Sequence, residues 1–221
     1  MSDFVGILAI RRGSKGVVDK NRRVFNGEPL YSIAIKRFEN LGLPYIVSTD
    51  FEIDELEGIA AKDFLKRNNR LATDDSHIFN VIEDVIIRRG LEEKVIVLVQ
   101  ATSPLIEGFH LKEAMNNYTN NNGNYMVASV VVTEKEILKQ GIIHKGLFEP
   151  VNKRDYCFSN RQSLPQTYKM TGGVYVFAAK SFIKDKGMHK MNILPLVIDA
   201  KYALDIDNEI DLANENWKTR D

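Results

Sequence analysis

The length, composition and charge of the chain favour one globular α/β domain and exclude several classes of protein. It has 221 residues, of which 44% are hydrophobic and 27% charged, so a sizeable core is expected. The 30 basic residues balance the 30 acidic ones, whereas a dedicated nucleic-acid-binding protein usually has a basic surplus. The single cysteine, Cys157, excludes an internal disulfide framework.

The first apolar segment, Phe4–Ile10, predicts a buried strand. It is too short to span a membrane, and it lacks the basic flank and the small-residue cleavage site of a signal peptide. We therefore expect no membrane partner and a cytoplasmic location, with which the low cysteine content agrees.

Three nearly continuous apolar segments are typical of strands that are covered on both faces, as in a parallel sheet. They are Phe4–Ile10, Val95–Val99 and Met126–Val132. A shorter strand is predicted at Tyr45–Ser48 and a later one at Gly173–Phe177.

Amphipathic segments between these strands predict helices. One apolar stripe runs from Leu30 to Leu41 and is followed by Gly42, a residue that often ends a helix. A second stripe covers residues 78–86, and a third helix is predicted at Phe109–Asn117. The basic pair at positions 36 and 37 falls on the polar face of the first helix, as solvated charge. This alternation predicts a doubly wound, mostly parallel Rossmann-like α/β sheet.

The pattern weakens between Thr133 and Tyr168, where periodicity is poor and charges are scattered. We interpret residues 133–168 as an inserted lobe or dimer arm within a single domain that covers residues 1–221. A final helix is predicted from about Asn208 to Trp217.

A glycine-containing basic loop, Arg11–Gly16, follows the first predicted strand. Ligands of α/β sheets bind beyond the carboxyl ends of the strands, and glycines let backbone N–H groups approach an anion. Arg11, Lys15 and Lys20 add positive charge, and Ser14 adds a hydroxyl. The loop matches neither the Walker A pattern nor G-x-G-x-x-G. By itself it is either a cradle for a nucleoside triphosphate or an ordinary basic turn.

Five segments, in order along the chain, resemble the motifs of the acylneuraminate cytidylyltransferase family, which makes CMP-sialic acid and its relatives. They are RRGSKGVVDKN, RNNRLATDDS, LVQATSPL, RQSLPQTYKMTGGVYVF and LDIDNEIDL. The resemblance runs from Ala9 to Leu212. It implies a fold of the nucleotide-diphospho-sugar transferase type and the transfer of CMP from CTP to the anomeric hydroxyl of a nine-carbon acidic sugar.

The resemblance assigns a nucleotide-binding role to seven residues. These are Arg11, Ser14, Lys15, Lys20, Asn21, Arg67 and Ser76. Arg11 and Lys15 would hold the triphosphate and stabilise the departing pyrophosphate, because a polyanion needs charge-assisted donors. Arg67 and Ser76 would read the cytosine. Without the resemblance, Arg67 is a surface residue at a strand end and Ser76 is a helix N-cap.

The resemblance also implies a sugar-binding set. Its members are Gln100, Thr102, Ser103, Arg161, Gln162, Tyr168 and Lys169. The first three follow the strand Val95–Val99, where uncharged hydrogen-bonding groups suit a polyhydroxylated substrate, although a Ser-Pro turn has the same sequence. Arg161 matches a functional arginine whose guanidinium suits the sugar carboxylate or the phosphates, and we count it with Arg11 and Lys15 as catalytic.

Asp205 and Asp207 match the closing D-I-D motif and would bind Mg²⁺, a hard ion that prefers carboxylate and phosphate oxygens. Taken alone, the pair is a polar strand end with Asp207 as a helix cap.

Two departures from the family pattern stand out. Ala101 replaces a proline, and Thr171-Gly172 replaces Asn-Gly beside the expected sugar site. The identity of the sugar, whether neuraminate, legionaminate or pseudaminate, is therefore open. The family also implies a homodimer. Alternative functions are transfer to another acidic sugar such as 3-deoxy-octulosonate, and a non-catalytic nucleotide-binding module.

Overall fold

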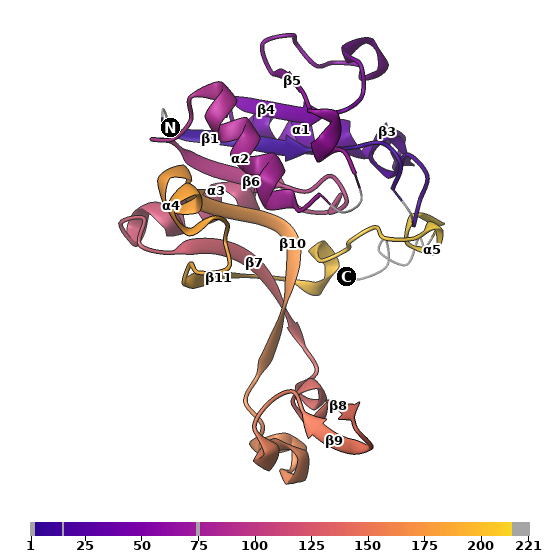
Figure 1. The fold of residues 1–221 in the computed structure, drawn as a ribbon, viewed down its shortest axis with the longest axis vertical. Coiled ribbons are helices and arrows are strands. Elements are labelled where there is room, and N and C mark those ends of the chain that lie inside the picture. Colours follow the sequence, from indigo (N-terminus) through magenta and orange to yellow (C-terminus); the bar gives the residue numbers. More distant parts are fainter. Residues whose placement is uncertain (1–2, 15, 74–75, 214–221) are drawn as a thin grey trace.

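A seven-stranded sheet forms the centre of the protein, with the strand order β11-β7-β10-β6-β1-β4-β5 (Figure 1). The structure, a computed structural model, describes residues 3–14, 16–73 and 76–213. The strands are β1 (Phe4–Ala9), β4 (Tyr45–Thr49), β5 (Phe64–Lys66), β6 (Val95–Val99), β7 (Met126–Thr133), β10 (Thr167–Ala178) and β11 (Ile193–Ile198). Only β10 runs antiparallel to its neighbours. The predicted, mostly parallel sheet is confirmed.

Helices cover both faces of this sheet, which confirms the doubly wound arrangement. One core cluster joins the sheet to α1 (Leu30–Asn40) and α3 (Gly108–Asn120). The other core cluster joins it to α2 (Ile78–Arg89) and α4 (Ala179–Asp185). Because both faces are covered, the central strands are apolar throughout, which is why they could be found as continuous segments in the sequence.

The helix ends follow local chemistry. Gly42 and Gly90 have φ of 61° and 63° after α1 and α2, in the left-handed region that glycine adopts without strain. His77, rather than Ser76, caps α2: its Nδ1 accepts a hydrogen bond from the Phe79 N–H at 3.2 Å. A short hairpin, β2 (Val24–Phe25) and β3 (Glu28–Pro29), precedes α1. The last described helix, α5 (Glu209–Ala213), begins where it was predicted; Trp217 lies outside the described residues.

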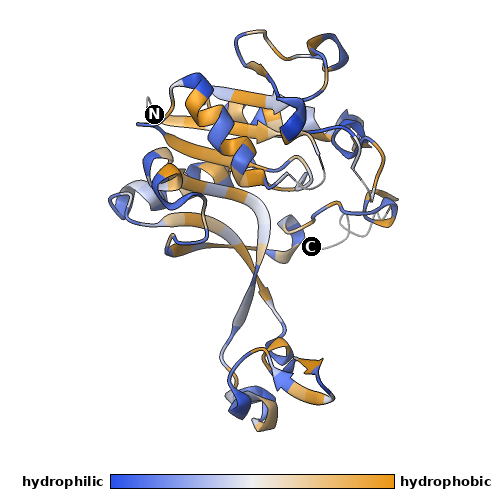
Figure 2. Ribbon diagram, in the orientation of Figure 1, coloured by the Kyte–Doolittle hydropathy of each residue, from blue (hydrophilic) through white to orange (hydrophobic). Residues whose placement is uncertain are grey.

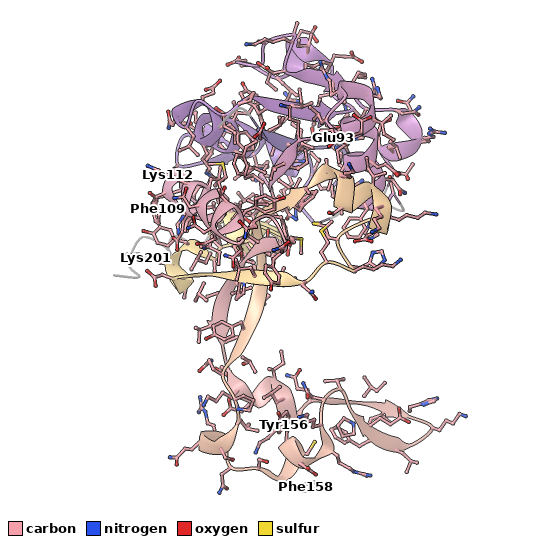
Figure 3. The ribbon with its side chains drawn as sticks, turned by 90° about the vertical axis from the view of Figure 1, so that its left-hand side faces the viewer. Glu93, Phe109, Lys112, Tyr156, Phe158 and Lys201 are labelled. Carbon is pink, nitrogen blue, oxygen red and sulfur yellow. The ribbon has the colours of Figure 1, made fainter. Side chains whose placement is uncertain are left out.

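Beyond the sheet, β7 and β10 continue as a two-stranded ribbon to an arm formed by residues 134–166 (Figure 1). The arm contains the hairpin β8 (Gly141–His144) and β9 (Leu147–Pro150). It carries hydrophobic segments (Figure 2), and Phe158, on its side away from the sheet (Figure 3), is 85% exposed. Further exposed apolar side chains of the arm are Ile142, Ile143, Leu147, Phe148 and Val151.

A register shift interrupts the pairing of β10 with β7 between Met170 and Tyr175. The Ser129 and Thr171 hydroxyls lie 2.6 Å apart in the interior at this irregularity, and the Ser129 Oγ also accepts a hydrogen bond from the Val174 N–H. Thr171, which stands where the resembled family pattern has asparagine, is thus buried in the sheet. The predicted strand Gly173–Phe177 is only the inner half of β10.

Arg37 was predicted on the solvated face of its helix, and this is wrong. Its side chain is only 6% exposed, and its Nη2 donates a hydrogen bond to the Pro104 carbonyl at 2.6 Å. Burial lowers the pKa of this guanidinium to about 10. The contact ties α1 to the segment that follows β6.

Among the described residues, no helix is both long and apolar enough to cross a bilayer.

The packing of α1 on the sheet gives a test of the fold. A Cβ placed on Gly6 of β1 would lie 2.7 Å from the buried ring of Phe38. We expect Gly6→Ala to lower the free energy of unfolding by about 1–3 kcal/mol, the usual cost of overpacking. Urea denaturation followed by circular dichroism measures this.

Gly108→Ala at the start of α3 is the control, because its Cβ would meet nothing closer than Leu41 at 3.9 Å. This variant should be neutral or slightly stabilised, since alanine favours helix. Equal stabilities of the two variants would contradict the packing described.

Candidate active site

A cleft of about 310 Å³ opens at the carboxyl ends of β1 and β6. Its walls come from the first loop, from the segment that precedes α2 and from the loop after β6. The polar lining residues are Arg11, Ser14, Lys20, Asn21, Arg67, Thr73, Ser76, Gln100 and Thr102, and the apolar ones are Ala9, Leu71, Ile78, Val81, Leu98, Val99 and Ala101.

The first loop folds back on itself along one wall. The Ser14 Oγ accepts a hydrogen bond from the Lys20 backbone N–H at 3.1 Å, and the Asn21 amide donates to the Arg11 carbonyl at 3.0 Å. These bonds hold the loop so that the Arg11 and Lys20 side chains border the same space. Lys15 lies outside the described residues.

Arg67 and Ser76 lie in the cleft wall rather than on the surface. Arg67 is only 4% exposed, and its Nη2 donates a hydrogen bond to the Ser48 carbonyl at 2.9 Å. Burial, the main cause, lowers the pKa of Arg67 to about 10, while the charge of Asp50 opposes this shift. The buried Ser76 Oγ has no hydrogen-bond partner among the described residues. A ligand in the cleft would therefore meet a cation and an unsatisfied hydroxyl on this side.

The loop after β6 contributes two of its three predicted residues to the cleft. Gln100 and Thr102 line it, and the Thr102 hydroxyl donates to the Gln100 side-chain oxygen at 3.5 Å. Ser103 is 1% exposed and does not belong to the lining. Its side chain is therefore placed to support the loop rather than to contact a ligand in this cleft.

The acidic segment near the end of the described chain meets the first loop beside the cleft. Buried Ile206 anchors it, and the Ile206 N–H donates to the Thr102 carbonyl at 2.8 Å. The Lys20 ammonium donates to the Asp207 carboxylate at 3.0 Å and to the Ile206 carbonyl at 2.8 Å. The structure thus brings the cationic loop and the acidic pair to one place, although they lie far apart in the sequence.

The two carboxylates have different surroundings. Asp205 Oδ1 is buried and has no partner among the described residues, and burial raises the pKa of this carboxyl while a Thr102 hydrogen bond opposes the shift. The Asp207 side chain is 73% exposed. Asp207 does not cap α5; instead, Asn208 Oδ1 accepts hydrogen bonds from the N–H groups of Ile210 and Asp211.

This pair fits a Mg²⁺ site that the substrate completes. The described part of the chain has no cluster of three or more His, Cys, Asp or Glu side chains that could hold a metal by itself. The unsatisfied oxygen of Asp205 and the exposed oxygens of Asp207 would supply one or two ligands. Mg²⁺ commonly takes its remaining ligands from phosphates and water.

Four of the predicted sugar-binding residues lie on the arm or on the ribbon that leads to it. Arg161 and Gln162 border a separate hollow of about 550 Å³ at the base of the arm, where Arg161 Nε lies 2.7 Å from a Glu136 carboxylate oxygen. Tyr168 and Lys169 are on β10, and the Lys169 charge is one of the smaller effects that oppose the burial-driven rise in the pKa of Asp205. Within one chain, Arg161 and Gln162 do not line the cleft at the carboxyl ends of β1 and β6.

Sequence reasoning missed the apolar floor of the cleft. Ile78 and Val81 were assigned only to the core stripe of a helix, and Leu71 fell within the motif RNNRLATDDS but was given no role of its own. A stripe at helical spacing has the same pattern whether its first turn meets the core or a ligand. The backbone carbonyl of Ile206, which contacts Lys20, has no sequence signal.

Comparison with known proteins identifies the family of this chain and several relatives. Residues 5–207 match the family described as cytidylyltransferase. The chain is 27% identical to the N-acylneuraminate cytidylyltransferase of Streptococcus agalactiae serotype III (strain NEM316), over 93% of this chain and 50% of that protein, so it spans half the length of that relative. It is 26% identical to the CMP-N,N'-diacetyllegionaminic acid synthase of Campylobacter jejuni serotype O:2, over 96% of this chain and 92% of that protein.

A solved structure, CMP:2-keto-3-deoxy-manno-octonic acid synthetase complexed with CTP, has the same fold. Its TM-score is 0.68 at 13% sequence identity, with 96% of this chain and 95% of that chain covered. At such low identity the likeness concerns the fold alone.

The contact between the first loop and the acidic segment can be tested at Gly16. A Cβ placed there would overlap the backbone oxygen of Asp207. We expect Gly16→Ala to push the two segments apart and to weaken CTP binding about tenfold, which corresponds to ~1.4 kcal/mol of steric cost. Isothermal titration calorimetry measures this, and wild-type affinity would contradict the close contact.

Proposed function

This chain belongs to the cytidylyltransferase family, and we propose that it transfers CMP from CTP to the anomeric hydroxyl of a sialic-acid-like nonulosonic acid, with release of pyrophosphate. The observation that carries this proposal is the convergence of the basic first loop, the polar loop after β6 and the acidic segment at one cleft. The basic loop would bind the triphosphate, the polar loop would bind the hydroxyl groups of the sugar, and the acidic segment would bind the metal ion.

The cleft supports a division of roles for the nucleotide. Its apolar floor, which includes Ile78, Val81 and Leu98, suits the face of a pyrimidine, and the free hydroxyl of Ser76 and the guanidinium of Arg67 supply hydrogen-bond donors beside it. Lys20 lies where the cleft meets the acidic segment, and Arg11 lines the same cleft. There they would neutralise the triphosphate, which carries about four negative charges near neutral pH.

Catalysis by these residues would consist of positioning and charge neutralisation. Gln100 and Thr102 would hold the sugar so that its anomeric oxygen faces the α-phosphorus, while Arg11 and Lys15 stabilise the charge that develops on the leaving pyrophosphate. Asp205 and Asp207 would hold Mg²⁺, which supplies charge neutralisation at the phosphate oxygens and acidifies a bound hydroxyl. In the present structure Lys20 pairs with Asp207. When the nucleotide binds, a phosphate would replace Asp207 as the partner of Lys20, and Mg²⁺ would replace Lys20 as the partner of Asp207.

The class of sugar is inferred from the relatives and from the chain's polar residues. Two relatives that the chain matches along more than nine-tenths of its own length are named for N-acylneuraminate and N,N'-diacetyllegionaminic acid, both nonulosonic acids. The carboxylate of such a sugar needs a cation, and Lys169 of β10 lies near enough to Asp205 to influence its pKa. Lys169 would therefore be a cation that can meet the sugar carboxylate within one chain.

We further propose a homodimer in which the arm packs on a second copy of the chain. The arm exposes several large apolar side chains, and it carries a groove of about 670 Å³. The groove is lined by apolar Leu147, Phe148, Pro150 and Phe158 together with Lys139, Glu149, Arg154 and Cys157. Clustered exposed apolar side chains are a common mark of a protein–protein interaction surface. Arg161 and Gln162, remote from their own cleft, would then serve the partner's site.

The activity is tested by CTP-dependent pyrophosphate release with a panel of neuraminate, legionaminate, pseudaminate and 3-deoxy-octulosonate. We expect release with a nonulosonic acid and with Mg²⁺. Asp207→Ala should lower kcat/KM by at least about a hundredfold, because several kcal/mol of charge stabilisation depend on the metal.

Asp54→Ala, which removes an exposed carboxylate from the short helix Ile53–Glu55, is the matched control and should be fully active. Release with 3-deoxy-octulosonate alone would replace the proposed sugar class. CTP binding without release for any sugar would leave a nucleotide-binding module instead of an enzyme.

The oligomeric state is tested by sedimentation velocity on the full chain. We expect a dimer at micromolar concentration, and Phe158→Glu should shift it toward monomer, because a charge would be buried in an apolar contact. Ile87→Glu, at an exposed apolar position on α2, is the control and should sediment like the wild type. A wild-type monomer at all concentrations would refute the dimer.

A further inference from the structure

A second ion pair joins the same two segments that meet at the cleft. Arg23 Nη1 and Nη2 donate to the two carboxylate oxygens of Glu209 at 2.7 and 2.8 Å. This parallel, two-bond arrangement fixes the direction as well as the distance between the two side chains. Neither residue lines the cleft.

Both partners are attached to rigid local structure. Arg23 follows the 3₁₀ helix Lys20–Arg22, and its carbonyl accepts the Leu30 N–H at 3.0 Å, which ties it to the start of α1. Glu209 is the first residue of α5, where Asn208 Oδ1 accepts hydrogen bonds from the Ile210 and Asp211 N–H groups and the Asp211 carboxylate accepts one from the Asn208 N–H. The pair therefore connects two well-defined turns.

The spacing links this pair to the residues of the site. Arg23 is three residues after Lys20, and Glu209 is two residues after Asp207. In the proposed function the Lys20–Asp207 contact opens, because Lys20 would bind the nucleotide phosphates and Asp207 would bind the metal. The Arg23–Glu209 pair has no such competing ligand, so it can hold the segments together through binding.

We propose that Arg23 and Glu209 are positioning residues: their bidentate ion pair keeps Asp205 and Asp207 at the distance from the first loop at which one metal ion can contact both carboxylate and triphosphate. This proposal rests on the function proposed above. A small displacement of the acidic segment would separate the metal ligands from the phosphates, and catalytic geometry is sensitive to displacements of about 1 Å.

The test is a double-mutant cycle with Arg23→Gln, Glu209→Gln and the double variant. Both side chains are about half exposed, so the fold should survive, as thermal unfolding would verify. Binding of Mn²⁺ to the protein with CTP, followed by electron paramagnetic resonance, is the main readout because it does not depend on turnover. CTP binding in the presence of EDTA is measured alongside.

We expect each single variant to raise the apparent Kd of Mn²⁺ in the CTP complex by about two- to fivefold, the range of an exposed ion pair. The double variant should be no worse than either single one, because the pair acts as a unit. CTP affinity in EDTA should remain within about twofold of wild type, since the metal ligands are then idle. The Mg²⁺ concentration for half-maximal pyrophosphate release should follow the Mn²⁺ result.

Lys180→Gln and Glu93→Gln form the matched control (Glu93 is labelled in Figure 3). The Lys180 ammonium and the Glu93 carboxylate form an exposed ion pair at 3.4 Å, and neither residue lines the cleft. Unchanged Mn²⁺ affinity in Arg23→Gln and Glu209→Gln, or additive losses in the double variant, would overturn the positioning role. If the wild type binds CTP and Mn²⁺ yet releases no pyrophosphate with any sugar, the proposed function fails, while the cycle still decides the role of the pair in metal binding.

Discussion

The arrangement of the site depends on one contact, between the basic loop after β1 and the acidic segment before α5. Lys20 and Asp207 are 187 residues apart in the sequence and 3.0 Å apart in space. Two neighbouring constraints support this contact: the buried side chain of Ile206 and the hydrogen bond from its N–H to the loop after β6. The loops after β1 and β6 lie at the same edge of the sheet because these two strands are adjacent and parallel. The Ile206 hydrogen bond then attaches the acidic segment to that edge.

Two buried arginines lie near the candidate site, Arg67 in the wall of the cleft and Arg37 behind the loop after β6. Arg67 and Arg37 are bonded to backbone carbonyls, and burial lowers both pKa values to about 10. Each remains charged near neutral pH, so each contributes positive potential where water screens little. Arg67 directs this potential into the cleft, whereas Arg37 holds the loop from behind through Pro104. A net charge of zero thus coexists with a cationic site.

The arm differs from the rest of the described chain in the exposure of its apolar side chains. The sheet and its helices bury their apolar surface within one chain, while the arm leaves its own apolar surface exposed. An extended β7–β10 ribbon is the only described link between them, so the arm gains little packing from its own domain (Figure 1). This geometry is the reason that Arg161 and Lys169, eight residues apart, face different surroundings.

The sequence by itself determined the elements whose signal is local. These are strands that are buried on both faces, such as Val95–Val99, then the apolar stripe of α1 with its end at Gly42, and the cationic character of the first loop. It did not reveal that Arg37 is buried, that Ser103 is withdrawn from the cleft, or that the antiparallel β10 continues into the arm. Only the tertiary structure decided these points, because each depends on a partner distant in the chain. A periodic pattern records which face of an element is apolar, but the neighbour that covers this face is set by the packing of the whole sheet.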